Sequence, residues 1–269
     1  VNFIDTAELY GTYPYIKEVI RLTRTRPVIA TKTYAYTEKQ AQASLEKAFR
    51  EMGIDCVDAF LLHEQESAMT LKGHAPALEV LVNARKRGDV RAVGISTHHV
   101  RAVYAAADTP EIDVIHPIIN KYGVGIMDGN ADDMLRAIKY AFSKGKGLYG
   151  MKALGGGNLI GRAAECFDFV LGLNELDSIA VGMQSKEEVV ANVNVFSGMK
   201  VPAVIEEKLR LKKRRLHIED WCEGCGRCTD VCRFHALNIV QGKAVVDAGK
   251  CMLCGYCGAS CRAMAIKVI

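Results

Sequence analysis

The sequence contains no long uninterrupted apolar run, and none reaches the roughly 18 residues that a membrane-spanning helix needs. It shows no secretory signal, and its formal net charge of +4 is too small to indicate nucleic acid by itself. Cysteine is almost absent from the first 220 residues, where only Cys56 and Cys166 occur. These two are expected to be buried packing residues. With 49% hydrophobic and 25% charged residues, the 269-residue chain is expected to form one large domain and one small one.

The chain also lacks an initiator methionine. It opens on Val1 to Asp5, which read as an apolar strand. We therefore expect that a segment of the protein precedes Val1.

The eight remaining cysteines form two groups with the same C-x2-C-x2-C-x3-C spacing. The first group is Cys222, Cys225, Cys228 and Cys232, and the second is Cys251, Cys254, Cys257 and Cys261. An offset of 29 residues, the distance from Cys222 to Cys251, superimposes the groups and also aligns Gly226 with Gly255. The segment is therefore an internal duplication.

This spacing favours 4Fe–4S clusters. Three cysteines two residues apart can wrap a loop around three corners of a cubane, and the fourth thiolate must come from elsewhere. The segment resembles the bacterial two-cluster ferredoxins, in which the fourth ligand comes from the other repeat. The resemblance implies two ligand sets. One set is Cys222, Cys225, Cys228 and Cys261, and the other is Cys251, Cys254, Cys257 and Cys232.

Zinc and disulfides are the alternatives for these cysteines. Zinc usually uses two ligand pairs with a longer gap between them. Disulfide frameworks are typical of small secreted domains. One departure from the ferredoxins is that Arg233 and Arg262 follow the last cysteine of each group, where that family usually has proline. Proline stiffens the turn without binding iron, so we expect the ligands to be unaffected.

Strand-like and helical patterns alternate seven times over the first two hundred residues. Strands are expected at Val1–Asp5, Val28–Lys32, Val57–His63, Val90–Ser96, Asp113–Asn120, Gly147–Ala153 and Ser178–Gly182. Helices are expected near 16–24, 37–52, 75–88, 99–107, 131–144, 162–174 and 186–196. Strands with continuous rather than alternating apolar residues indicate a parallel sheet.

We therefore expect an α/β fold: a (β/α)8 TIM-type barrel that lacks its first β/α unit in this chain, followed by a small α+β ferredoxin domain. An open doubly wound sheet is the alternative. The expected domains are a barrel at residues 1–199, a basic linker at 200–217 and a ferredoxin-like domain at 218–269. The basic residues between Lys208 and Arg215 are interpreted as a solvated surface, with docking of an acidic partner as the alternative.

Polar residues follow the strands where each one ends. They are Asp5, Lys32, His63, Ser96, Asn120 and Lys152. In a barrel the carboxyl ends of the strands meet at one mouth, where catalytic groups gather. We expect the active site there.

Residues 1–197 resemble the aldo-keto reductase family. The resemblance is carried by the segments NFIDTAELYG, VIATKTY and AFLLHEQE, and by VRAVGIST, GMKALGGGNL and VGMQSKEEVVANV further along the chain. It implies that Tyr10 is the proton donor to a carbonyl oxygen, with Lys32 as a neighbouring cation that lowers its pKa. Asp5 would fix Lys32, and His63 would orient the substrate. Tyr13 and Tyr15 lie nearby, but only Tyr10 precedes glycine as in the family pattern.

The resemblance also implies a nicotinamide cofactor, with NADPH and NADH both open. Ser96 and His116 would contact the carboxamide, although Thr97 and His116 stand where the family usually has Asn and Gln. Met151 would pack on the nicotinamide ring, and Gly155–Gly157 would approach the pyrophosphate. The adenosine half would meet Gly182, Gln184, Glu188 and Asn192.

The combined prediction is a cytoplasmic iron–sulfur oxidoreductase. The barrel would transfer hydride between a nicotinamide and a carbonyl or alcohol, and two 4Fe–4S clusters would transfer electrons. The alternative is that the barrel is a scaffold or a nicotinamide sensor and electron transfer is the activity. Hydride carries two electrons whereas each cluster takes one, and no flavin motif is evident. Expected partners are a small carbonyl or alcohol substrate and a redox partner protein. Neither nucleic acid nor a membrane is expected.

Overall fold

The computed structural model describes all 269 residues, which divide into two compact units. The barrel unit comprises Val1–Ile118, Asp128–Gly150 and Glu175–Ala180. The second unit comprises Ile119–Met127, Met151–Asn174 and Val181–Ile269. None of the helices has the length and apolarity that crossing a bilayer requires.

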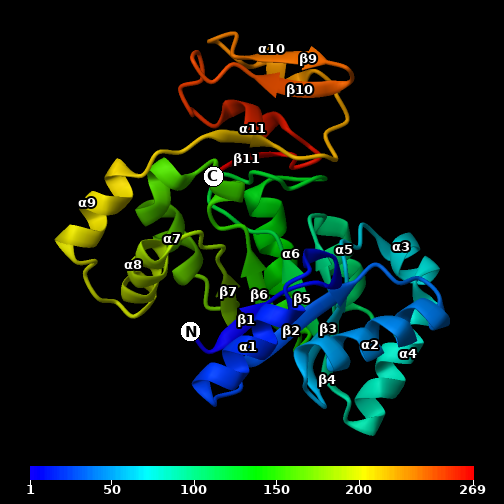
Figure 1. Cartoon of the computed structure of the whole chain (residues 1–269). Coiled ribbons are helices and arrows are strands. Elements are labelled where there is room, and N and C mark those ends of the chain that lie inside the picture. The colour runs from blue at the N-terminus through cyan, green and yellow to red at the C-terminus, as the bar shows by residue number, and fades with distance from the viewer. The chain divides into compact units, whose positions relative to one another are not determined.

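One seven-stranded sheet organises the barrel unit (Figure 1). Its strands are β1 (Phe3–Asp5), β2 (Val28–Thr33), β3 (Val57–Leu62), β4 (Val90–Thr97), β5 (Val114–Pro117), β6 (Gly147–Met151) and β7 (Ser178–Ala180). They lie side by side in chain order, and the pairs from β1 to β6 are parallel. A doubly wound sheet would reverse its strand order at a switch point. The sequential order therefore confirms the barrel prediction and excludes the alternative.

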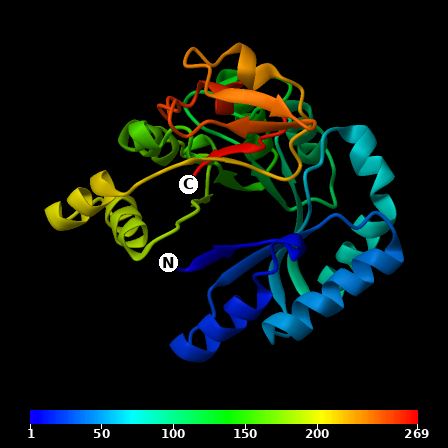
Figure 2. The ribbon, with the colours of Figure 1, turned by 45° about the horizontal axis from the view of Figure 1, so that its top comes forward.

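Helices of the barrel unit lie on the outer side of this sheet (Figures 1 and 2). They are α1 (Tyr13–Thr23), α2 (Glu38–Met52), α3 (Ala68–Gly73), α4 (Ala75–Arg87), α5 (Val100–Ala107) and α6 (Ala131–Ser143), and the 3-10 turn η1 (Glu8–Tyr10) follows β1. The start of α2 is fixed by a reciprocal capping box, in which the Thr37 side chain accepts from the Gln40 backbone N–H and the Gln40 side chain from that of Thr37. The sheet and its outer helices therefore bring the carboxyl ends of the strands to one edge.

The inner face of the sheet is filled by side chains from several strands. Ala30, Ala59, Leu61 and Tyr149 form a buried cluster there, with Phe3 packed against it. Gly94 allows β4 and β5 to approach closely, because a Cβ at this position would lie 2.1 Å from the carbonyl oxygen of Val114. The interior is thus a packed core, as expected for a barrel of this size.

The second unit begins with segments that follow β5, β6 and β7. The loop after β6 holds the 3-10 turns η2 (Gly155–Gly157) and η3 (Ile160–Arg162) and leads into α7 (Ala163–Leu171). Further on lie α8 (Lys186–Phe196) and α9 (Ala203–Leu211), the latter within the residues expected as a linker. The domain limits at residues 199 and 217 stay a prediction.

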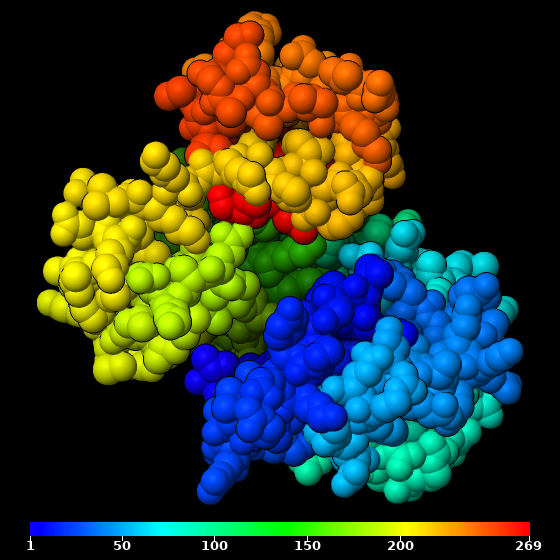
Figure 3. All heavy atoms as spheres, in the orientation of Figure 1, coloured from blue at the N-terminus to red at the C-terminus, as the bar shows by residue number.

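Residues 216–269, the tail, contain two short antiparallel pairs. β8 (Leu216–Ile218) pairs with β11 (Ile266–Val268), and β9 (Leu237–Val240) pairs with β10 (Lys243–Val246). The short helices α10 (Arg227–Asp230) and α11 (Tyr256–Ser260) each follow a glycine with positive φ, 81° at Gly226 and 82° at Gly255. The duplication expected from the 29-residue offset is therefore present in the backbone. Figure 3 shows the orange and red residues of the tail as one packed body.

Candidate functional site

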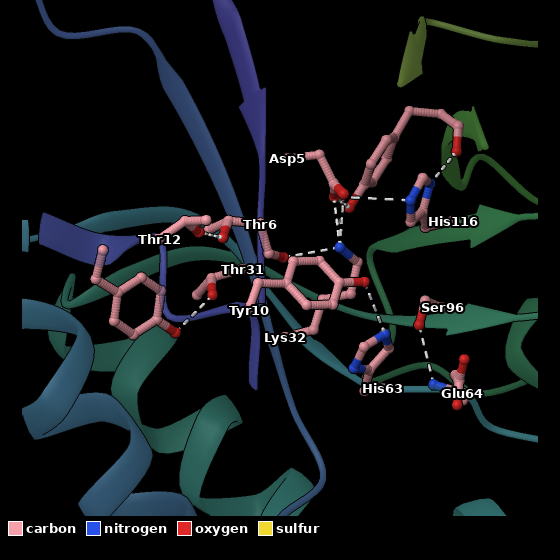
Figure 4. Close-up of polar contacts among 12 residues, drawn as sticks. Asp5, Thr6, Tyr10, Thr12, Thr31, Lys32, His63, Glu64, Ser96 and His116 are labelled. Carbon is pink, nitrogen blue, oxygen red and sulfur yellow. Dashed lines mark hydrogen bonds and ion pairs between the residues drawn. The ribbon is translucent and has the colours of Figure 1, made fainter. Parts of the chain in front are cut away.

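Four polar side chains of the barrel unit point toward one another (Figure 4). Asp5 ends β1, Tyr10 closes η1, Lys32 lies on β2 and His63 directly follows β3. Lys32 is 1% exposed, and its ammonium donates to both Asp5 carboxylate oxygens and to the Thr6 carbonyl, each at 2.7 Å. A buried lysine is rare unless it is paired. Here every ammonium proton has an acceptor.

Tyr10 is the member of this group that faces outward. Its side chain is 52% exposed, its hydroxyl lies 3.4 Å from Nε2 of His63, and the Lys32 ammonium lies 5.5 Å from its ring centroid. The neighbouring tyrosines differ. Tyr13 is buried with its hydroxyl bonded to Thr31 at 2.7 Å, and Tyr15 is 73% exposed. Of the three, Tyr10 is the one whose phenol adjoins Lys32 and His63.

The pKa of Tyr10 is raised above the ordinary value of 10.0, first by burial and then by the charges of Asp5 and Glu64. The sequence predicted the opposite direction, because a nearby ammonium stabilises a phenolate. That prediction is wrong. The Lys32 protons are donated to Asp5 and Thr6 rather than to the phenol. Burial also lowers the pKa of Lys32, against the opposing effect of Asp5.

Tyr149 joins this group, although the sequence analysis did not identify it. Its hydroxyl donates to Asp5 at 3.0 Å, and its ring stacks on His116 with centroids 3.8 Å apart. His116 in turn lies with Nδ1 2.6 Å from the Tyr149 carbonyl and Nε2 3.6 Å from Asp5. The imidazole of His116 therefore faces Asp5 and Tyr149. Its assignment to the nicotinamide carboxamide stays a prediction.

Tyr34 and Glu64 form a second feature that the sequence did not single out. The Tyr34 hydroxyl donates to Glu64 at 2.5 Å, and the Tyr34 ring lies 4.5 Å from that of His63. Glu64 has a left-handed backbone with φ of 51°, and its N–H donates to Ser96 Oγ at 2.9 Å. A non-glycine residue held in this conformation is uncommon. Such strain is a structural signal that the sequence does not carry.

Two of the six strand-end polar residues belong to the second unit. There the Asn120 amide donates to the carbonyls of Val124, at 2.9 Å, and Lys152, at 3.4 Å. Asp5, Lys32 and His63 form the group in the barrel unit, where buried Ser96 pairs in register with His116. Asn120 and Lys152 therefore bind each other, through the side chain of Asn120 and the backbone carbonyl of Lys152.

The residues expected near the adenosine half also lie in the second unit. The Gln184 N–H donates to the Glu188 carboxylate at 2.7 Å, at the start of α8. Lys212 bonds the same carboxylate at 2.7 Å, and Arg214 lies 3.5 Å from it. The basic run is therefore partly engaged with α8 rather than fully solvated. Gly182 is exposed, whereas Met151 and Asn192 are half-buried.

The cysteines of the tail lie close to one another. Burial raises the pKa of the Cys228 thiol, and the thiols that face it are Cys222, Cys261 and Cys225. Cys261 comes from the other repeat. A separate cavity, with an empty volume of about 340 Å³ that includes space open to solvent, is lined by four cysteines. They are Cys232, Cys251, Cys254 and Cys257.

The donor set fits cubanes better than a single ion. No group of three or more His, Cys, Asp or Glu side chains is arranged to hold one metal ion, as a zinc site would require. A cubane binds each thiolate to a different iron. Backbone amides also aim at the sulfurs, from Ala236 to Cys232 at 3.3 Å and from Ala244 to Cys222 at 3.4 Å. All ten cysteines are free of disulfides.

Two family models match the chain. Residues 1–170 match the aldo/keto reductase family, and residues 216–238 match the 4Fe-4S binding domain. The first match covers more than half of the chain.

Curated relatives resemble part of the chain. An aldo-keto reductase of Mycolicibacterium paratuberculosis is 32% identical over 100 residues, which are 35% of this chain and 34% of the relative. An NADPH-dependent alpha-keto amide reductase of Saccharomyces cerevisiae is 27% identical over 136 residues, 46% of this chain and 44% of the relative. The chain thus aligns with less than half of either relative.

Solved structures share the fold over a larger portion. An aldo-keto reductase of Pseudomonas aeruginosa has a TM-score of 0.61 at 20% identity, covering 74% of this chain and 77% of that chain. An aldo-keto reductase of Klebsiella pneumoniae in complex with NADPH has a TM-score of 0.59 at 20% identity, with coverage of 78% and 80%. Similarity at this level of identity supports the barrel fold.

Proposed function

Because the chain belongs to the aldo/keto reductase family, we propose that it transfers hydride between a nicotinamide and a small carbonyl or alcohol substrate. The observation that carries this proposal is the contact group of Asp5, Tyr10, Lys32 and His63. A partly exposed phenol beside an imidazole offers a proton donor and an orienting group together. These are the two things that a carbonyl oxygen requires as it becomes an alcohol.

Each residue has a distinct role in this proposal. Tyr10 donates the proton to the carbonyl oxygen, and His63 binds that oxygen and orients the substrate. Lys32 supplies a fixed positive charge near the phenolate that Tyr10 leaves behind. Asp5 holds Lys32 through two hydrogen bonds. The bound nicotinamide supplies the hydride.

We propose NADPH as the nicotinamide. Two similar proteins support this choice: the yeast relative is named NADPH-dependent, and the Klebsiella structure is a complex with NADPH. Buried Ser96 and His116 are the proposed carboxamide contacts, and Met151 the proposed ring contact. The proposed contacts to the adenosine half are Gly182, Gln184, Glu188 and Asn192.

We propose two 4Fe–4S clusters in the tail, which would provide one-electron transfer. The proposed sets are Cys222, Cys225, Cys228 with Cys261, and Cys251, Cys254, Cys257 with Cys232. The mutual approach of the members of each set supports this assignment. A cytoplasmic location is part of the proposal, since a reducing environment preserves exposed clusters.

A second candidate is that electron transfer is the activity and the barrel is a scaffold or a nicotinamide sensor. One observation favours it. Each repeat exposes one of its cysteines, Cys225 in the first and Cys254 in the second, so that both clusters would be reachable by a redox partner protein. The two candidates differ in whether Tyr10 matters.

The Tyr10→Phe variant separates them. We expect NADPH-dependent reduction of a carbonyl panel to fall by about 10²–10⁴-fold, the usual contribution of a general acid. Cluster absorbance and electron transfer should persist. Tyr15→Phe, which changes an exposed tyrosine, is the matched control. Unchanged carbonyl turnover in Tyr10→Phe would show that another group donates the proton.

A further inference from the structure

The loop after β6 and the second cysteine group lie against each other within the second unit. β11 packs against η2, and a Cβ added to Gly157 would lie 2.2 Å from the Val268 carbonyl oxygen. Gly157 has φ of 88°, a conformation that glycine adopts readily. Gly157 thus permits the close contact of η2 with the tail.

Asn158 is the residue that joins the two segments. Its amide nitrogen donates to the Gly155 carbonyl at 2.8 Å and to the Ile266 carbonyl, in β11, at 3.1 Å. Its amide oxygen is buried and accepts no hydrogen bond. A buried amide oxygen without a donor is destabilising. A position retained at this cost calls for an explanation.

The cysteine loop of the second repeat is shaped around this side chain. A Cβ at Gly258 would lie 2.0 Å from the Asn158 amide oxygen, and a Cβ at Gly255 would lie 2.7 Å from the Asn158 carbonyl oxygen. Both glycines flank cysteines of one proposed ligand set, Cys254 and Cys257. Asn158 therefore occupies space that only glycine leaves open.

The two repeats differ at this point. The residue of the first repeat equivalent to Gly258, 29 positions earlier, is Thr229, whose hydroxyl donates to the Gly226 carbonyl of its own repeat. The second repeat lacks this side chain and has Asn158 against its loop instead. The departure from the duplicated pattern coincides with the contact.

We propose that Asn158 is a positioning residue that couples the second cysteine loop to the loop after β6. The loop after β6 contains Gly155–Gly157, which we assigned to the pyrophosphate, so this inference rests in part on the proposed function. With the loop from Cys254 to Cys257 fixed around its cluster, Asn158 is held and the loop after β6 keeps its shape. Loss of that cluster releases Asn158 and weakens nicotinamide binding.

Matched cysteine variants test the coupling. Cys225 and Cys254 occupy equivalent positions in the two repeats, and both are exposed. In anaerobically prepared full-length protein, we expect Cys254→Ala to raise the Kd for NADPH at least five-fold more than Cys225→Ala does. The measurement is a fluorescence titration, with iron and sulfide analysis of the same samples. Equal changes in the two variants would contradict the coupling.

Asn158 itself is tested by the reduction potentials of the clusters. We expect Asn158→Ala to shift the potential of one cluster and leave that of the other in place, as measured by redox titration followed by electron paramagnetic resonance. In the Asn158→Asp variant, which adds a negative charge, the same cluster should become harder to reduce. No shift in either variant, or equal shifts of both clusters, would overturn the assignment.

A pair of substitutions covers the case in which a variant loses its tail structure. Gly258→Ala should lower cluster retention in the wild-type background, because the added Cβ meets Asn158. In the Asn158→Ala background, Gly258→Ala should lower cluster retention less. The difference between the two effects measures the coupling between Asn158 and Gly258. If the effects of the two substitutions on cluster retention were additive, the contact between Asn158 and Gly258 would be contradicted. If the wild type binds no NADPH, the proposed function fails, while the potential and retention measurements still decide the role of Asn158.

Discussion

At the residue scale, Lys32 shows how a buried charge is retained next to the phenol that we propose as the proton donor. Its three hydrogen bonds to Asp5 and Thr6 offset the loss of hydration, and they also fix the ammonium in one place. The proton affinity of Tyr10 is governed by burial and by the carboxylates around it. Among these carboxylates Glu64 is the exposed one, so it can be changed without opening the core.

The first consequence is a pH dependence. In the proposed reaction Tyr10 donates a proton only while it is protonated, so reduction should be lost as the pH rises through the pKa of Tyr10. Because that pKa is raised, kcat/KM for reduction should stay flat past pH 10.0, the ordinary tyrosine value. Glu64→Gln removes a negative charge that raises this pKa, and the decline should therefore begin at lower pH. The measurement is the pH profile of kcat/KM.

The control for this prediction is Glu66→Gln, an exposed carboxylate two residues away. In this variant, kcat/KM should decline at the same alkaline pH as in the wild type. Identical profiles for wild type and Glu64→Gln would show that Glu64 does not act on Tyr10.

The sequence predicted only part of this site. Asp5, Lys32 and His63 were identified because each is polar at the end of an apolar strand. Tyr149 was missed because its partner Asp5 lies 144 residues away, and strand periodicity does not reveal contacts across a barrel. Tyr34 was missed for a different reason. Its partner Glu64 has a left-handed backbone, which the sequence does not reveal.

At the scale of elements, periodicity located all seven strands and the helices between them. It did not find α3, which is short, although Ser67 and Thr70 form a capping box there that was available in the sequence. It did not find α9 either, because Gly198, Pro202 and the basic residues from Lys208 onward favoured a linker in this region. The helices that periodicity missed were therefore short or exposed to solvent.

Gly94 supports a prediction about the sheet. A Cβ there would meet the Val114 carbonyl of β5 at 2.1 Å and the Leu61 side chain at 2.6 Å. Gly94→Ala should therefore destabilise the protein by about 1–3 kcal/mol, the usual cost of overpacking. It should also lower activity, because Ser96 and His116 lie on these two strands. Chemical denaturation followed by circular dichroism measures the first effect.

Gly73→Ala in α3 is the matched control, since nothing lies within 4 Å of a Cβ at that position. It should be neutral or slightly stabilising, as alanine is in a helix. Equal losses of stability in Gly94→Ala and Gly73→Ala would show that the close approach of β4 to β5 is not what excludes a side chain at position 94.

At the scale of the whole molecule, the chain combines a barrel fold with a duplicated cysteine-rich tail. The spacing predicts that each group supplies three ligands to one cluster, and the resemblance to two-cluster ferredoxins implies that the fourth comes from the other repeat. The ligand sets stay a prediction, which the nearness of Cys261 to Cys228 supports. The sequence predicted two domains, but it did not predict that the loops after β5 and β6 belong to the same compact unit as the tail.

The crossed arrangement predicts which variants resemble each other. Cys261→Ala and Cys222→Ala should remove the same paramagnetic signal, although the residues lie in different repeats. Cys232→Ala and Cys251→Ala should remove the other signal, and each variant should lose about half of the iron and sulfide. Cys56→Ala is the control and should retain both. If variants grouped by repeat instead, each cluster would be held by one repeat alone.

A reciprocal exchange of ligands is also the arrangement expected of two identical chains related by a twofold axis. On the proposed pairing, a peptide with only the first cysteine group would have three of its four ligands placed for one cubane and a single leftover thiolate facing another. Two such peptides would complete each other. The tail therefore has the form of a symmetric homodimer joined into one chain, and Thr229 and Gly258 mark where its halves have since diverged.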